Sequence, residues 1–570
     1  MSYTSPQEIF MNKKLPIGIS DFKEVIEGDY AYIDKTLFIQ EILEKGTKVA
    51  LIPRLRRFGK TLNLSMLRYF FEKSQTDTSH LFKNLNIWKL EKYKILQGQF
   101  PVIFISLKDI KYNSWEESFE ALREILAEEF QRHDYLLQDN ILASQEKESY
   151  LTILNREGSQ MLYAKSLQFL TKCLHRYHQK KVIILIDEYD TPAHSAYIGG
   201  YYDTLINFLR NWLSNGLKDN SDLERGVLTG ILRIAKESIF SGLNNISTFT
   251  ILNEEFQDKF GLLESEVEKL LQDYSLSSQL PELRQWYNGY RIGSCVGIYN
   301  PWSVLNCIAK RGILIPYWVN TSDNILMKTL ITKGSDDLKI QVEELLRGGV
   351  IKKTIEEGIV FSELETSPDT IWALLLFSGY LTLDSTPVYG TPCHLRIPNI
   401  EVTELYKSMI LDWFKKSIQE PKYHLLLNSL ISGDMETFSL LFQEFLLSSV
   451  SVFDVPAEES EKIYHAFILG MLIGLKSSYE IKSNRESGLG RYDVILIPKN
   501  PKDLGIVMEF KKISPFKKMD LETAAASALD QIEEKQYDQE LFNRDIHRAL
   551  HIGFAFEGKY VLIRHKFKSL

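Results

Sequence analysis

A glycine, a lysine and a threonine follow one another at Gly59, Lys60 and Thr61, between an apolar segment and a helical pattern. A residue without Cβ lets backbone N–H groups approach phosphate oxygens, an ammonium binds the β- and γ-phosphates, and a hydroxyl binds Mg²⁺. The amino end of the following helix adds its dipole. These residues predict a phosphate-binding loop for ATP, with nucleotide contacts from Arg57, Phe58, Gly59, Lys60, Thr61 and Leu62.

The loop departs from the pattern G-x-x-x-x-G-K-[ST] at one position. Arg54 stands where the first glycine should be, and the loop interior carries Arg56 and Arg57. The alternative interpretation is a basic turn before an amphipathic helix, without a nucleotide.

A second segment, residues 180–192, favours the nucleotide. Five apolar residues there end in Asp187 and Glu188. This is typical of a Walker B strand, whose first carboxylate holds Mg²⁺ and whose second orients or deprotonates the attacking water. We therefore predict Thr61 and Asp187 as magnesium ligands and Glu188 as the catalytic residue of ATP hydrolysis.

Charged residues near the carboxyl end predict a second chemistry. Residues i and i+2 of a strand share a face, so Glu509 and Lys511 should point the same way, and a hairpin could place Asp493 beside them. Two carboxylates can hold Mg²⁺ or Mn²⁺, while a lysine positions water and offsets charge on a scissile phosphate. We predict all three as catalytic residues, with Asp493 and Glu509 as metal ligands. The alternative is an ordinary surface ion pair on a hairpin.

The elements that must position the first site alternate between strands and helices. Apolar strands and helical patterns up to about residue 250 predict a three-layer α/β domain with a parallel sheet, its ligand at the carboxyl ends of the strands. A strand over 225–232 brings Thr229 and Arg233 to where a polar residue could sense the γ-phosphate. An ordinary exit from the strand explains either residue equally well.

The middle of the chain carries no comparable motif. Residues 253–324 are mostly helical in pattern, and we expect their aromatic residues to pack a helical lid rather than to stack on bases: Trp286, Tyr287, Tyr290, Tyr299 and Trp302. Residues 336–402 show two helices and a hairpin, which is winged-helix-like. The helix around Trp372 is too apolar to read a DNA groove, so we favour a structural role.

Composition limits the class of protein. A chain of 570 residues predicts three to four domains, and four scattered cysteines without CxxC spacing argue for a reducing compartment and against a structural zinc site. No apolar run approaches the roughly 18 residues of a membrane span, and the first residues are polar, so we expect a cytoplasmic protein without a membrane partner. The net charge is −8, yet from Ser460 onward Lys and Arg outnumber Asp and Glu by 18 to 15. Any nucleic-acid contact should therefore be local.

Several segments resemble the predicted AAA-ATPase-like family of prokaryotic proteins, whose members commonly carry a C-terminal nuclease-like domain of the PD-(D/E)XK superfamily. They include PRLRRFGKT, LIDEYD, TGILRIAKESIFSGLNN, WYNGYRIG, GRYDVIL and MEFKK, and the resemblance covers almost the whole chain. In that family the first loop glycine is also replaced. The resemblance implies the roles predicted above and adds three weaker candidates: Arg233 at the nucleotide, Glu461 as a metal ligand and Gln531. A solvated helix face explains Glu461 equally well, and a hydrogen bond to the sheet edge explains Gln531 equally well.

The predicted fold class is α/β, with a P-loop NTPase three-layer domain, a helical lid and a winged-helix-like module, followed by an αβββαβ PD-(D/E)XK nuclease-like domain. The predicted bounds are 1–250, 251–335, 336–450 and 451–570. We expect an ATP-hydrolysing protein coupled to a Mg²⁺- or Mn²⁺-dependent nuclease acting on nucleic acid, with DNA as the preferred substrate, in defence or mobile-element conflict. A homo-oligomer is a further possible assembly. The alternative is a nucleotide-switched signalling or scaffold ATPase whose nuclease-like domain only binds nucleic acid or protein.

Overall fold

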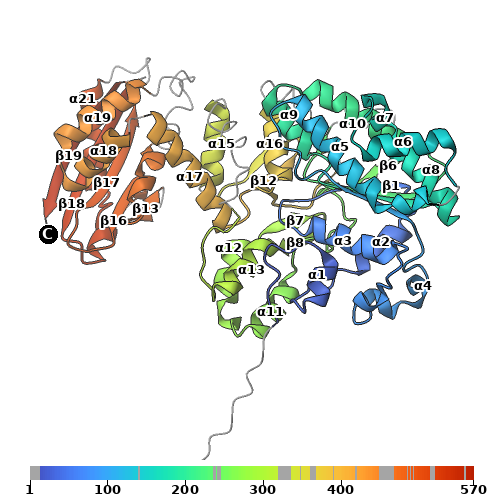
Figure 1. Cartoon of the computed structure of the whole chain (residues 1–570). Coiled ribbons are helices and arrows are strands. Elements are labelled where there is room, and N and C mark those ends of the chain that lie inside the picture. The colour runs from blue at the N-terminus through green and yellow to red at the C-terminus, as the bar shows by residue number, and fades with distance from the viewer. Residues whose placement is uncertain are drawn as a thin grey trace, which may run out of the picture. The chain divides into compact units, whose positions relative to one another are not determined.

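The chain forms two compact units, Met1–Thr321 with Val350–Val402, and Ser322–Gly349 with Thr403–Leu570. Figure 1 shows the elements of each unit. The computed structural model describes residues 13–138, 141–234, 239, 245–318, 336–346, 348–359, 368–388, 390–417, 420–448, 468–483, 486–487, 490–491, 493–513, 520–557 and 560–569. Across these ranges, no helix is long and apolar enough to cross a membrane. The four-domain division stays a prediction.

Five parallel strands form the central sheet of the first unit, in the order β2-β3-β4-β1-β6. They are β1 (Val49–Pro53), β2 (Val102–Ser106), β3 (Val182–Asp187), β4 (Leu223–Gly230) and β6 (Ile246–Thr248). Every residue of β1 and β3 is buried, as expected for apolar strands covered on both faces. The register pairs Pro53 with Gly230 and Ser106 with Asp187, so the strands end at one edge of the sheet.

Helices cover both faces of this sheet (Figure 1). On one face α3 (Lys60–Phe71) contacts β2, β3 and β4, and α1 (Phe22–Glu27) packs on α3. The other face is covered by α5 (Trp115–Arg132), α8 (Ser166–His178) and α10 (Tyr202–Leu217). The shorter helices of this part of the chain are α2 (Leu37–Glu44), α4 (Glu91–Lys94), α6 (Ser144–Leu154), α7 (Gln160–Ala164) and α9 (Thr191–Gly199). The three-layer α/β fold predicted from the sequence is confirmed.

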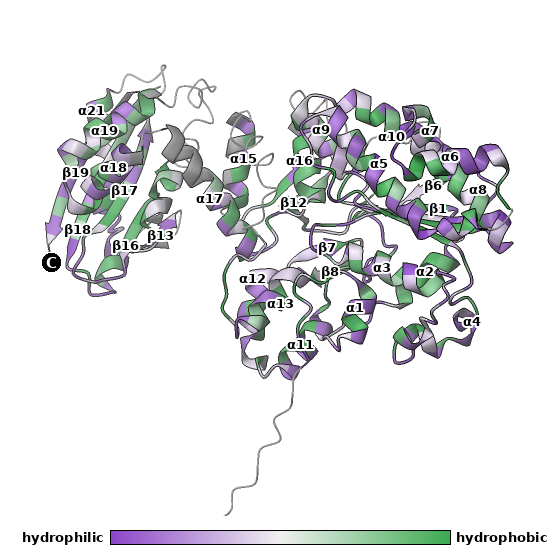
Figure 2. Ribbon diagram, viewed as in Figure 1, coloured by the Kyte–Doolittle hydropathy of each residue, from purple (hydrophilic) through white to green (hydrophobic). Residues whose placement is uncertain are grey.

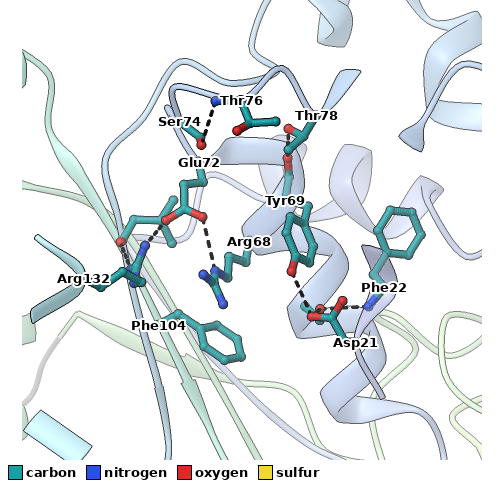
Figure 3. A network of polar contacts seen from close by, with 12 residues as sticks. Asp21, Phe22, Arg68, Tyr69, Glu72, Ser74, Thr76, Thr78, Phe104 and Arg132 are labelled. Carbon is teal, nitrogen blue, oxygen red and sulfur yellow. Dashed lines mark hydrogen bonds and ion pairs between the residues drawn. The ribbon is translucent and has the colours of Figure 1, made fainter. Parts of the chain in front are cut away.

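Polar contacts fix α3 along its length (Figure 3). The Asp21 carboxylate accepts hydrogen bonds from the Ser65 hydroxyl at 3.2 Å and the Tyr69 hydroxyl at 3.0 Å. Near the end of the helix, Glu72 accepts from Arg68 Nε at 3.2 Å and pairs with Arg132 of α5. Charged hydrogen bonds in partly buried positions restrict motion of the helix. These contacts anchor the middle and the carboxyl end of α3.

The segment after the sheet is mainly helical. It comprises α11 (Glu264–Asp273), α12 (Leu280–Tyr287), the hairpin β7 (Tyr290–Ile292) and β8 (Cys295–Ile298), and α13 (Pro301–Ala309). Tyr287, Tyr290 and Tyr299 are at most 1% exposed, and Trp286 and Trp302 pack against the same cluster. The prediction of aromatic core packing is confirmed.

Residues Val350–Val402 form a small module within the first unit. Its elements are β9 (Ile351–Lys353), β10 (Gly358–Ile359), α16 (Pro368–Phe377), β11 (Thr382–Leu383) and β12 (Cys393–Arg396), with an antiparallel sheet in the order β11-β12-β9. All residues from Ile371 to Phe377 are buried, so α16 has a structural role. β10 pairs with β5 (Arg233–Ile234), the strand that follows β4. The first predicted helix of a winged helix, α15 (Asp336–Leu346), groups with the second unit.

The second unit is built on a five-stranded mixed sheet, β13-β16-β17-β18-β19, in which only β17 and β18 run parallel. The strands are β13 (Tyr479–Ser483), β16 (Val494–Pro498), β17 (Gly505–Lys512), β18 (Arg548–Glu557) and β19 (Tyr560–Ser569). The last strand was not predicted from the sequence. Figure 2 shows hydrophobic residues concentrated on β16, β17 and β18.

Successive side chains of these strands point to opposite faces of the sheet, and a helical layer packs on each face. Met508 and Phe510 share a core with α18 (Glu420–Ser432) and α19 (Met435–Ser448). Val507 shares a core with residues of α21 (Leu521–Glu534) and α22 (Gln539–Phe542). Because Glu509 and Lys511 alternate with Phe510, they lie on the face covered by α21. Most of α17 (Ile400–Ser417) also belongs to this unit.

Candidate functional site

The loop after β1 places a glycine at the point where α3 starts. Gly59 has a φ of 83° and caps the helix, and Lys60 is its first residue. Asn63 N–H donates to the Gly59 carbonyl at 3.0 Å, which closes the first turn. The backbone N–H groups of this turn have no helical partner, so they are available to an anion.

Five residues converge at this edge of the sheet: Lys60 and Thr61 at the start of α3, Asp187 and Glu188 at the end of β3, and Thr229 near the end of β4. Lys60 Nζ lies 3.5 Å from Glu188 Oε1, and the Thr61 hydroxyl donates to Asp187 Oδ2 at 2.8 Å. Thr229, near the end of β4, donates to Asp187 Oδ1 at 2.7 Å. β4 lies between β1 and β3, so Thr229 reaches Asp187 from the strand next to it. A hydroxyl and a carboxylate in contact are oxygen ligands of the kind that Mg²⁺ takes.

The pKa values of the two acids at this edge shift in opposite directions. Burial, and then the charge of Glu188, raise the pKa of Asp187. Burial also acts to raise the pKa of Glu188, but Lys60, Thr191 and Arg56 outweigh it and lower that pKa below its usual value. Glu188 is therefore an ionised base at neutral pH. Its φ of 51° is a left-handed conformation that costs a non-glycine residue free energy, as often found at functional positions.

The second predicted site assembles at β16 and β17. Asp493 Oδ2 accepts the N–H of Phe510 at 2.8 Å, which brings it beside Glu509. Lys511 Nζ lies 3.6 Å from Glu509 Oε1. Gln531 of α21 bridges the two, because its amide nitrogen donates to Glu509 and its amide oxygen accepts from Lys511. Gln531 Nε2 also donates to the Tyr537 hydroxyl at 3.1 Å.

The carboxylate of Glu509 and its surroundings are suited to binding a divalent cation. It is 3% exposed, and burial together with the charge of Asp493 raises its pKa to about 8 in spite of Lys511. Its Oε2 atom is buried and accepts no hydrogen bond from any residue that the structure describes. Such an oxygen beside a second carboxylate would be neutralised by a metal. No group of three His, Cys, Asp or Glu side chains within the described ranges has the geometry of a metal site, so this one rests on two carboxylates.

Comparison with known families supports both predicted domains. A family model described as "Predicted AAA-ATPase" matches residues 16–240, and a model of the PD-(D/E)XK nuclease superfamily matches residues 459–566. The chain joins an AAA-ATPase-like domain to a PD-(D/E)XK nuclease superfamily domain. An uncharacterized protein in the vnfD 5′ region of Azotobacter chroococcum mcd 1 is 26% identical over 445 residues, which span 76% of this chain and 78% of that protein.

The remaining predicted residues of the AAA-ATPase-like domain have varied surroundings. Arg57, with a φ of 65°, lies over the ring of Trp302 at 4.3 Å. Phe58 is buried edge-on against Tyr290, and Leu62 is half-buried in the first turn of α3. Arg233 lies on β5 and pairs with Glu357 at 3.3 Å. The structure therefore brings together Lys60, Thr61, Asp187 and Glu188, while Arg57 and Arg233 contact other parts of the first unit.

In the nuclease superfamily domain, Asp493, Glu509, Lys511 and Gln531 come together, and Glu461 lies outside the described residues.

Sequence reasoning missed Asp190 of the AAA-ATPase-like domain. It is 4% exposed, and its Oδ2 accepts the N–H groups of Ile231 at 3.0 Å and Leu232 at 2.8 Å. Burial, and then Glu188, raise its pKa to about 6. Asp190 thus ties the Walker B turn to the loop after β4, and its only sequence signal was a third acid in LIDEYD.

Proposed function

We propose that this protein binds and hydrolyses ATP and cleaves nucleic acid, with DNA as the main substrate, through a divalent-metal-dependent phosphodiesterase site. The observation that carries the proposal is the buried Glu509 carboxylate, which is held beside Asp493 and shares Gln531 with Lys511. A hairpin built only for stability gains little from two acids at such a position, because their repulsion must be offset. A metal ion would offset it.

In the ATPase part, Lys60 supplies positive charge for the β- and γ-phosphates, and the N–H groups at the start of α3 bind their oxygens. Thr61 and Asp187 would hold Mg²⁺. Glu188 stays ionised beside Lys60 and orients or deprotonates water for attack on the γ-phosphate.

In the nuclease part, Asp493 and Glu509 would hold Mg²⁺ or Mn²⁺, which supplies Lewis acidity and lowers the pKa of bound water. Lys511 orients water and offsets charge that develops on the scissile phosphate. Gln531 holds the side chains of Glu509 and Lys511 in position through its two hydrogen bonds. The surplus of basic residues from Ser460 onward supports a polyanionic substrate.

The setting that we propose is conflict with foreign DNA or mobile elements in a bacterial cytoplasm. The competing function is that of a protein that binds DNA without cutting it and that changes its partners with its ATP state. The cleavage assay below separates the two.

A paired assay tests the proposal. ATP turnover and cleavage of plasmid DNA, with a matched RNA as a second substrate, are measured in Mg²⁺ and in Mn²⁺ for the wild type, Glu188→Gln and Glu509→Gln. We expect Glu188→Gln to lose turnover, and Glu509→Gln to lose cleavage and Mn²⁺ binding by calorimetry. Wild-type protein that binds DNA but cleaves neither substrate would favour the competing function.

A further inference from the structure

Arg54 occupies the place of the first loop glycine, and the backbone explains why a side chain is tolerated there. Its N–H donates to the Gly230 carbonyl at 2.9 Å, which extends the β1–β4 ladder by one residue. The left-handed positions of the loop come later, at Arg57 and Gly59. Arg54 therefore needs no glycine conformation.

The guanidinium of Arg54 points into the protein. Its Nη1 donates to the carbonyls of Pro53 at 2.9 Å and Phe249 at 2.6 Å, and its Nη2 donates to the carbonyl of Glu255 at 2.8 Å. Its Cζ lies 5.2 Å from the centre of the Phe260 ring. The residue is 0% exposed, so it is closed to a phosphate and bound to backbone. Burial lowers its pKa to about 9, which leaves it charged at neutral pH.

The chain segment that receives Arg54 supports the loop at two more points. Gly261 N–H donates to the Phe58 carbonyl at 3.2 Å, and Asn63 Nδ2 donates to the Lys259 carbonyl at 2.9 Å. Residues 249–261 thus contact the chain just before and just after its Gly-Lys-Thr residues. Arg54 makes the largest share of these bonds.

We propose that Arg54 is a positioning residue for ATP. Its planar fork spans the carbonyls at positions 249 and 255 and holds the loop in the curvature that presents Lys60 and the N–H groups of α3 to the phosphates. In other phosphate-binding loops a glycine allows this curvature, whereas here a buried arginine sets it. This inference rests on the ATP binding of the proposed function.

Arg225 provides a matched control. It also ties backbone carbonyls outside its own strand, since Nη1 donates to the carbonyl of Ile42 in α2 at 2.7 Å and to that of Thr47, just before β1, at 2.9 Å. It lies near the amino end of β4, at the other end of the strand from Gly230. Loss of either arginine should destabilise the domain, but only loss of Arg54 should weaken ATP binding.

The experiment measures the ATP Kd by calorimetry, well below the unfolding temperature of each variant, for full-length wild type, Arg54→Gly, Arg54→Lys and Arg225→Ala. We expect Arg54→Gly to raise the Kd at least about tenfold although it restores the usual glycine, and Arg225→Ala to stay within about twofold. Arg54→Lys keeps the charge but cannot span two carbonyls, so we also expect a raised Kd. It serves as the test if Arg54→Gly does not fold.

A wild-type Kd in Arg54→Gly or in Arg54→Lys would overturn the inference. So would an equal loss of affinity in Arg225→Ala, because general destabilisation would then explain both. A wild-type chain that does not bind ATP at all would instead overturn the proposed function, and the two failures are distinguishable.

Discussion

Glu188 and Glu509 show how the surroundings of a carboxylate decide its task. Both are largely buried, but Lys60 holds the pKa of Glu188 below its usual value, whereas burial and Asp493 raise the pKa of Glu509 to about 8. The first acid is an ionised base without further help. The second is mostly protonated at neutral pH, and a bound metal cation would favour its ionised form.

Lys60 should matter for binding and Glu188 for hydrolysis. Lys60→Ala removes the ammonium predicted to bind the β- and γ-phosphates, so we expect ATP affinity to fall roughly 10- to 100-fold. Glu188→Gln should bind ATP nearly as the wild type does and lose turnover by roughly 10²- to 10⁴-fold. Calorimetry and phosphate release measure the two effects. Unchanged affinity in Lys60→Ala would exclude a phosphate-binding loop.

Lys511 should affect the rate of cleavage rather than the binding of metal. Its ammonium lies 3.6 Å from Glu509 Oε1 and should stabilise charge that develops in the transition state. Lys511→Ala should keep Mn²⁺ binding and lose cleavage by about 10²-fold. Lys502→Ala, at an exposed turn of the same domain, is the control for loss of one positive charge. Loss of Mn²⁺ binding in Lys511→Ala would contradict this assignment.

Among the elements, α21 depends on a glycine of β18 to approach the nuclease site. A Cβ atom on Gly553 would lie 2.4 Å from the Ala525 carbonyl oxygen and 3.0 Å from Ala528 Cβ. Gly553 is also the register partner of Glu509. The close approach of helix and strand therefore sets the reach of Gln531 to Glu509.

Gly553→Ala should push α21 away from the sheet. We expect a loss of about 1–3 kcal/mol in the free energy of unfolding of this domain and a fall in cleavage, with ATP turnover unchanged. Denaturant unfolding and the paired activity assay measure both. Wild-type cleavage in this variant would show that Gln531 does not need its present position.

The start of α17 carries a buried acid that titrates near neutral pH. Glu401 is 0% exposed and accepts hydrogen bonds from the Ser303 hydroxyl at 2.8 Å and from Trp318 N–H at 2.7 Å. Burial outweighs these bonds and raises its pKa to about 7. The folded state therefore holds this proton at a pH where the unfolded chain has released it.

Stability should fall as pH rises through this range. The unfolded pKa is near 4.5 and the folded pKa about 7, so the contribution of the protonated acid is complete below about pH 4.5 and lost as pH approaches and passes 7. The loss is roughly 3 kcal/mol at about 1.4 kcal/mol per pKa unit. Glu401→Gln, which stays neutral, should flatten this slope in unfolding experiments at pH 5 to about 8. An unchanged slope would exclude Glu401 as its source.

At the scale of the whole molecule, the two sites belong to separate compact units. Any influence of ATP on cleavage must pass through an element with two arrangements. The Val350–Val402 module is our candidate, because β10 pairs with β5 and Glu357 pairs with Arg233, just after the loop that Asp190 holds.

Cleavage should depend on nucleotide state. We expect Glu188→Gln, which retains bound ATP, to cleave DNA at different rates with ATP, with ADP and without nucleotide. Glu357→Gln in the same background should reduce these differences by weakening the pairing with Arg233. Equal rates in all three states for Glu188→Gln would mean that the two domains work independently.

The sequence by itself determined the local chemistry. Apolar strands that end in Asp187 and Glu188, a Gly-Lys-Thr turn before a helix, and the shared face of Glu509 and Lys511 all follow from spacing along a few residues. The alternation of strands and helices was enough for the three-layer α/β class, and the burial of the aromatic cluster was predictable from its apolar character.

Only the tertiary structure decided which distant residues meet. Strand order placed β4 between β1 and β3 and so brought Thr229 to Asp187. The inward turn of Arg54 depends on carbonyls about 200 residues away, and the bridge of Gln531 depends on how closely α21 packs on Gly553. Such contacts are set by register and packing between segments far apart in the chain, and no local period of the sequence encodes them.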